Sequence, residues 1–291
     1  MSSFEIRHVA ETVSTQTDAR QLDQPGIAIV ADRQTGGYGT VNPSTGQRSK
    51  WRGDKGDLLM SFAVAADANL LTEMTFVTAL AVRNALNTYI SADQAEIFFS
   101  RPDDIHVRLS GESFRGKMAG IIVEKSDVEE GLLVAGVGVN LWPAERPKNY
   151  GKSFRPVSLS DCRPEFMPGN MMLARKLLKE FEKTYAQWQS EGLESIMRSM
   201  NLLPENPKDR QVTLYVEEYD DTPPNIVQGE FKGFDNNPVP GLRRMFIQPA
   251  GGKERLAISS NKVTFLPPGR EQDLEIFLRN SHPAAQVLVH D

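Results

Sequence analysis

The stretch RQTGGYGTVNPSTGQRSKW, residues 33–51, combines residue types that could bind an anion. Closely spaced glycines let backbone N–H groups approach a phosphate or a carboxylate. Loops of this kind usually carry arginine or lysine between the glycines, where this chain has Tyr38 and Thr40. Further cations follow near the end of the stretch, at Arg48, Lys50 and Arg52. The stretch therefore indicates an anion-binding loop whose charges are either displaced or lost.

Composition limits the class of protein. The chain has 291 residues, 40% hydrophobic and 24% charged, as expected for a globular protein of one or two domains. Its net charge of -5 argues against non-specific binding to nucleic acid or to an anionic membrane. A single cysteine, Cys162, excludes a disulfide framework and a cysteine-based zinc cluster, and the histidines show no ligand spacing. With no apolar signal segment and no membrane-length run, we expect a cytoplasmic protein.

The elements that must position this loop follow from hydrophobic periodicity. Two amphipathic helices are expected, at residues 72–90 and 171–189, because their apolar residues recur every three or four positions. Short apolar runs predict strands, one of them broken by a proline, at residues 27–31, 58–64, 95–109, 117–125 and 131–141.

The composition and hydrophobic pattern of the chain change after about residue 205. Short β-rich segments separated by Gly, Pro, Asn and Asp then follow, at residues 211–219, 227–235, 243–251 and 262–268. This pattern predicts an α+β domain followed by a small β domain. The pattern alone does not indicate a function.

Four segments, read in order, resemble the biotin protein ligase family. They are VSTQTDARQL; ADRQTGGYGT with the later KW and GDLLMS; FFSRPDDIHV followed by GKMAGIIVE; and VAGVGVNL followed by PVSLSD. Their order and spacing match the family over about residues 10 to 165. The resemblance implies a class II synthetase-like catalytic domain, a mixed sheet flanked by helices, at residues 1–207. It also implies a small SH3-like β-barrel at 208–270 and a tail at 271–291.

The resemblance implies an activity as well. Family members activate the carboxylate of biotin with ATP, forming biotinyl-5'-adenylate, and then transfer biotin to a lysine of a carrier protein. The expected ligands are biotin, ATP and Mg²⁺, and the expected partner is a biotin carboxyl carrier domain or a biotin-dependent carboxylase. A homodimer is possible in this family, whereas we expect neither nucleic acid nor a membrane as a partner.

Site residues are carried over from the family's motifs one position at a time. The resemblance assigns catalytic roles to Lys117, Asp104 and Arg101, and a magnesium site to Asp104 and Asp103. It assigns the biotin pocket to Ser14, Thr15, Gln16, Gln34, Gly37, Tyr38, Lys117, Gly120, Ile122 and Gly136. It assigns contacts with ATP to Thr40, Arg48, Lys50, Trp51, Arg52 and Asn140.

The chain departs from the family where charge matters most. Two loop arginines of the family align with Tyr38 and Thr40, and a family lysine aligns with Ser100. Neutral side chains do not replace the charge-assisted bonds of arginine. Three hypotheses follow. The first is a ligase in which Arg101 and a cation from residues 48–52 replace the lost charges. The second is a non-catalytic relative that binds biotin, a similar acid or a protein partner, and the third is a lipoate–protein ligase. Taken without the motifs, Lys117 is a surface lysine and Asp103-Asp104 a solvated turn.

Overall fold

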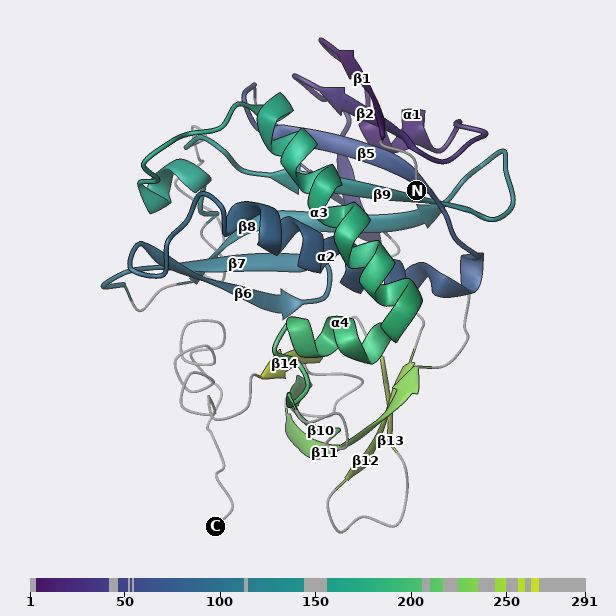
Figure 1. Ribbon diagram of the computed structural model, residues 1–291, viewed down its shortest axis with the longest axis vertical. Helices are drawn as coiled ribbons and strands as arrows, with labels where there is room; N and C mark the ends of the chain where they lie inside the picture. Colours follow the sequence, from purple (N-terminus) through teal and green to yellow (C-terminus); the bar gives the residue numbers. More distant parts are fainter. Residues whose placement is uncertain are drawn as a thin grey trace.

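The computed structural model of the protein describes residues 4–41, 47–51, 53, 55–112, 115–143, 156–205, 210–216, 225–234, 244–249, 256–259 and 263–266. Its centre is a seven-stranded sheet with the strand order β1-β2-β5-β9-β8-β7-β6 (Figure 1). The strands are β1 (Glu5–Val9), β2 (Ile27–Ala31), β5 (Leu58–Ala65), β9 (Leu132–Val139), β8 (Arg115–Lys125), β7 (Asp104–Leu109) and β6 (Ala95–Arg101). Because β1 pairs in parallel with β2 and the other neighbours are antiparallel, the sheet is mixed.

Helices cover the two faces of this sheet unequally. The long helices α2 (Leu71–Leu86) and α3 (Asn170–Glu191) lie across one face, with α4 (Leu193–Ser199) packed against them (Figure 1). The short helix α1 (Thr15–Ala19) packs on the other face, against β2, β5 and β9. Two short 3₁₀ helices, η1 (Ala68–Leu70) and η2 (Leu159–Cys162), complete this part of the chain.

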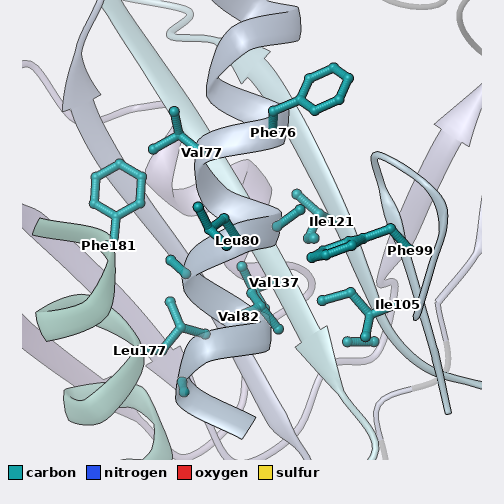
Figure 2. Packing of buried hydrophobic residues seen from close by; sticks show 14 of the residues in the cluster. Phe76, Val77, Leu80, Val82, Phe99, Ile105, Ile121, Val137, Leu177 and Phe181 are labelled. Atoms are coloured by element: carbon teal, nitrogen blue, oxygen red, sulfur yellow. The ribbon is translucent and has the colours of Figure 1, made fainter. Parts of the chain in front are cut away.

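The main core lies between the sheet and the long helices. In Figure 2, Leu177 and Phe181 of α3 lie on one side of α2, and Phe99, Ile105 and Ile121 of the strands lie on the other. The ring of Phe181 meets that of Phe62 on β5 edge-on, with centroids 4.7 Å apart. Both rings are fully buried. This core fixes the sheet against α2 and α3.

Side chains of the strands alternate between the two faces. On β5, Phe62 and Val64 belong to the core under the long helices, whereas Ala63 packs with Ala19 of α1 in a small second cluster. The α1 face has few large side chains in β8 and β9, because Gly120, Gly136 and Gly138 point no side chain there. A cavity can therefore form on this face.

A second sheet lies towards the C-terminus. Its strands, in the order β13-β12-β11-β10-β14, are β13 (Leu256–Ser259), β12 (Arg244–Pro249), β11 (Asn225–Phe234), β10 (Gln211–Val216) and β14 (Val263–Leu266). All their pairings are antiparallel. Among the residues that the structure describes, no pairing joins β13 to β14, so a closed barrel is not seen. Phe231, Met245 and Ile247 of this sheet join the main hydrophobic core.

Most predicted elements are confirmed, including both long helices, the break between β6 and β7, and strands in all four C-terminal segments. The sequence did not predict β1, α1, α4 or β13. The glycine-rich stretch also differs from the expected loop, because it contains a separate two-stranded sheet made of β3 (Tyr38–Val41) and β4 (Arg48–Lys50). None of the described helices is both long and apolar enough to cross a membrane.

Replacing Phe181 by alanine should lower the free energy of unfolding by about 3–5 kcal/mol, because it removes a fully buried ring from a close-packed core. Urea denaturation followed by circular dichroism measures the change. Met172→Ala on the same helix is the matched control, since that side chain is 49% exposed and its loss should change the free energy by less than about 0.5 kcal/mol. Equal effects of the two substitutions would contradict this description of the core.

Candidate active site

A cavity of about 470 Å³ lies on the sheet face that carries α1. Most of the predicted site residues meet in its wall. The residues assigned to the biotin pocket that line it are Ser14, Thr15, Gln16, Gln34, Tyr38, Lys117, Gly120, Ile122 and Gly136. Those assigned to phosphates, metal or catalysis that line it are Thr40, Lys50, Trp51, Asp103, Asp104, Lys117 and Asn140.

A hydroxyl and amide network forms the part of the cavity next to α1. The Thr15 backbone N–H and its Oγ1 both donate to Oε1 of Gln34, at 2.7 and 3.0 Å. Thr15 Oγ1 also lies 2.9 Å from Oγ of Ser61 on β5. These bonds fix the Gln34 amide, because its oxygen accepts two hydrogen bonds from Thr15. The network is buried at both hydroxyls, which makes its geometry well defined.

Gln16 adds a hydrogen-bond acceptor that has no partner among the described residues. Its Nε2 donates to the backbone oxygen of Val134 at 3.1 Å, so the amide orientation is fixed and Oε1 points the other way. Oε1 is buried and unbonded. A Cβ built on Gly136 would lie only 2.4 Å from it, so a side chain at this position of β9 would displace the Gln16 amide. Because an unsatisfied buried acceptor is costly, the site is suited to a ligand that donates an N–H here.

Trp51 forms the middle of the cavity. Its backbone N–H donates to the oxygen of Gly37 at 3.0 Å, which brings the indole onto β8 and β9. A Cβ on Gly138 would lie 2.2 Å from the indole, and one on Gly120 would lie 2.7 Å from it. The indole therefore rests directly on the bare backbone of the sheet. Its Nε1 is buried and has no partner among the described residues.

Lys117 and Asp104 form an ion pair in the cavity wall, with Nζ 2.5 Å from Oδ1. The Asp104 side chain is only 9% exposed, whereas that of Lys117 is 33% exposed and lies 5.6 Å from the Trp51 ring centroid. Asn140 donates through Nδ2 to the backbone oxygens of Lys117 and Val157. It thereby ties the lysine-bearing strand β8 to the segment that precedes η2.

The remaining predicted residues lie elsewhere. Gly37 and Arg48 are described but are not in the cavity wall. Arg48 instead donates to Glu124 at 2.7 Å and stacks over the Tyr38 ring at 4.4 Å. Arg52 lies outside the described residues, as does the side chain of Arg101, whose backbone ends β6 opposite Asp104.

Ser61 and Glu124 are among the contributions that the sequence did not predict. Ser61 lines the cavity, and its signal was a single hydroxyl within the apolar run LLMSFAV of β5. Glu124 holds Arg48 and Tyr38 but left no signal, because its partners are distant in the sequence. Cys162 is remote from this chemistry: burial raises the pKa of its thiol to about 12, so it is not a nucleophile at neutral pH.

The carboxylates of Asp103 and Asp104 are the candidate ligands for a divalent cation. Within the described part of the chain, no group of three or more His, Cys, Asp and Glu side chains could enclose a metal. Magnesium does not require such an enclosure, because it commonly binds one or two carboxylates together with the phosphates of a substrate. The donor set therefore suits a magnesium ion that arrives with a nucleotide.

Neither a protein-family model nor a curated protein matches this chain in sequence. Solved structures do match in fold. The biotin protein ligase of Aquifex aeolicus, in complex with biotin and ATP, is 20% identical, with a TM-score of 0.59 over 92% of this chain and 100% of that chain. The Leishmania major biotin protein ligase in complex with biotinyl-5-AMP is 18% identical, with a TM-score of 0.51 over 87% and 98%.

A third similar structure is a biotin protein ligase-like protein of unknown function from Silicibacter, 13% identical, with a TM-score of 0.52 over 88% of this chain and 94% of that chain. Similarity at these identities concerns the arrangement of the backbone. The mixed sheet with flanking helices matches the fold of these ligases. This chain has the biotin protein ligase fold.

Proposed function

We propose that the protein is a biotin–protein ligase, which forms biotinyl-5'-adenylate from biotin and ATP and transfers biotin to a lysine of a carrier protein. The observation that carries this proposal is one cavity with two chemically different ends. Along β9 the chain passes Gln16 at Gly136 and Trp51 at Gly138, and just beyond the strand Asn140 bonds to the backbone of Lys117. The four steps from Gly136 to Asn140 span roughly 13 Å in an extended chain, enough for a ring and its acid chain. The Aquifex ligase of the same fold binds both biotin and ATP, which supports the assignment.

The chemistry requires a cation where the acid meets the nucleotide. A carboxylate oxygen of biotin attacks the α-phosphorus of ATP, a phosphorus–oxygen bond forms, and the bond to pyrophosphate breaks. Lys117 is suited to stabilise the charge that builds up on the phosphate oxygens, since it lines the cavity beside Trp51. Asp104 orients this ammonium through the 2.5 Å pair.

In the second step the carrier lysine must reach the adenylate, and AMP must leave readily. The neutral amine of the carrier lysine attacks the carbonyl carbon of the adenylate, an amide bond forms, AMP leaves, and the amine proton passes to solvent. Trp51, packed on Gly138 and Gly120, limits the access of water to this anhydride. Asp103 and Asp104 would hold a magnesium ion, which when bound neutralises charge on the leaving pyrophosphate.

A second candidate function is binding without adenylation. It is favoured by the loop itself, because Tyr38 and Thr40 line the cavity where charge is needed and Arg48 is paired with Glu124. Within the described part of the wall, the cations are Lys50 and Lys117. Such a protein would retain the pocket for biotin, a similar small acid or a partner protein, but would not form the anhydride.

We also propose the wider organisation that the resemblance implies. The catalytic domain would span residues 1–207, and residues 208–270 would form an SH3-like barrel followed by a tail at 271–291. The partner would be a biotin carboxyl carrier domain or a biotin-dependent carboxylase in the cytoplasm. The enzyme itself could act as a homodimer.

Purified protein with biotin, ATP, Mg²⁺ and a carrier domain should yield biotinylated carrier, measured by mass spectrometry, and should catalyse biotin-dependent exchange between pyrophosphate and ATP. Lys117→Gln should slow both reactions by about 100-fold, the effect typical of removing one electrostatic donor. Lys125→Gln, at an exposed lysine on the same strand, is the matched control and should keep the wild-type rate. Biotin binding without exchange or transfer in the wild type would select the second candidate function.

Gln16 provides the test between biotin and lipoate. The cyclic urea of biotin carries N–H donors that can satisfy Gln16 Oε1, whereas a dithiolane ring carries none. Leaving this buried acceptor unpaired costs about 1–3 kcal/mol, so the pocket should reject lipoate. Lipoate ligation is therefore the less favoured hypothesis.

Gln16→Met should weaken biotin binding by about tenfold or more in calorimetry while leaving lipoate binding unchanged or stronger, because methionine has a similar volume and no acceptor to satisfy. Gln187→Met on α3, which also removes hydrogen bonds but far from the cavity, is the control and should leave both affinities unchanged. A wild-type protein that binds lipoate more tightly than biotin would refute the assignment of this end of the cavity.

A further inference from the structure

Glu124, near the end of β8, is a buried carboxylate outside the cavity wall on which three side chains converge. Its side chain is 11% exposed. Oε2 accepts from Tyr38 Oη at 3.1 Å, and Oε1 accepts from Arg48 Nη2 at 2.7 Å. Arg20 lies 3.7 Å from Oε1 and also pairs with Asp127. One carboxylate therefore joins β3, β4 and the residue that follows α1 to β8.

The strands β3 and β4 need such an anchor. They pair with each other, Tyr38 with Lys50 and Val41 with Arg48, but belong to neither of the larger sheets. A two-stranded unit is at best marginally stable alone in water. Two sets of side-chain contacts hold it on the main sheet: the indole of Trp51, which follows β4 and rests on Gly120 and Gly138, and the contacts of Tyr38 and Arg48 with Glu124.

The arginine of this cluster also supports the tyrosine directly. The Arg48 guanidinium lies 4.4 Å from the Tyr38 ring centroid, so the ring is held on its face by a cation and at its hydroxyl by Glu124. Tyr38 in turn lines the cavity, whereas Arg48 and Glu124 do not. Arg48 and Glu124 thus affect the cavity by setting the position of Tyr38.

We propose that Glu124 is a positioning residue, which fixes β3–β4 on β8 and sets Tyr38 in the cavity wall before any ligand binds. Arg48 is a structural cation in this arrangement and not a phosphate ligand. A glutamine at position 124 keeps only one of the two accepting oxygens, because its amide NH2 cannot accept a hydrogen bond, and it carries no charge to balance the guanidinium of Arg48. The choice of biotin as the ligand in the tests below rests on the function proposed above.

Glu124→Gln should weaken biotin binding about tenfold, as expected from losing a charged hydrogen bond, and should remove hydrogen-exchange protection from the amides of β3 and β4 in the ligand-free protein. Glu180→Gln is the matched control. Glu180 is a carboxylate of similar burial on α3 that pairs with Lys176 and Lys183, and its loss should leave the affinity and the exchange in β3–β4 unchanged. Wild-type affinity and protection in Glu124→Gln would overturn the proposal.

A double-mutant cycle separates positioning from a general loss of stability. Tyr38→Phe and Glu124→Gln should each weaken binding, and the double variant should bind no more weakly than the poorer single variant. Additive effects would overturn the inference that Glu124 acts through Tyr38. Glu124→Asp, which keeps the charge, should recover part of the affinity.

Two further comparisons keep the result interpretable. If Glu124→Gln does not fold, Tyr38→Phe and Arg48→Gln replace it, and unchanged β3–β4 exchange in both would overturn the proposal. If the wild type does not bind biotin, the proposed function fails, but the exchange of β3–β4 still measures the role of Glu124 without a ligand.

Discussion

The site depends on three glycines, Gly120, Gly136 and Gly138, on one face of β8 and β9. A sheet must bury at least one face, and here the face under α2 and α3 is buried in a continuous core. On the other face, Gly120, Gly136 and Gly138 leave the backbone bare, and the Trp51 indole and the Gln16 amide occupy the space. Any side chain at Gly136 or Gly138 would displace them, so the cavity and these two residues require each other.

This arrangement separates stability from function within one sheet. Phe62 and Ser61 are neighbours on β5, yet Phe62 packs against Phe181 in the core while Ser61 meets Thr15 in the polar network. The alternation of a strand makes this division possible, because each residue belongs to one face only. The core side holds the sheet rigid, and rigidity lets the cavity side keep buried polar atoms such as Gln16 Oε1 without collapsing onto them.

The sequence predicted the elements whose burial leaves a periodic pattern, such as α3 and the apolar strands β2 and β5. It missed β1, where His8 and Arg7 on an exposed edge strand interrupt any apolar run, and α1, which at five residues is too short for a helical period. The motifs located Thr15, Lys117 and most of the cavity wall. They could not place Arg48, because its ion pair with Glu124 joins residues 76 positions apart.

Residues 33–51 were predicted to form an anion-binding loop whose charges are displaced or lost, and the contacts of its glycines and cations bear on that prediction. The carbonyl of Gly37 accepts from Trp51, and Gly39 lies against the Ser49 side chain, where a Cβ would come within 2.5 Å of Oγ. These glycines allow β3 and β4 to approach each other and bring Trp51 onto the sheet. Arg48 is paired with Glu124 in this unit, so the cations in the described part of the cavity wall are Lys50 and Lys117, and Lys117 is already paired with Asp104. Catalytic competence therefore depends on whether a lysine, as a compact charge without the bidentate geometry of arginine, suffices at the phosphate.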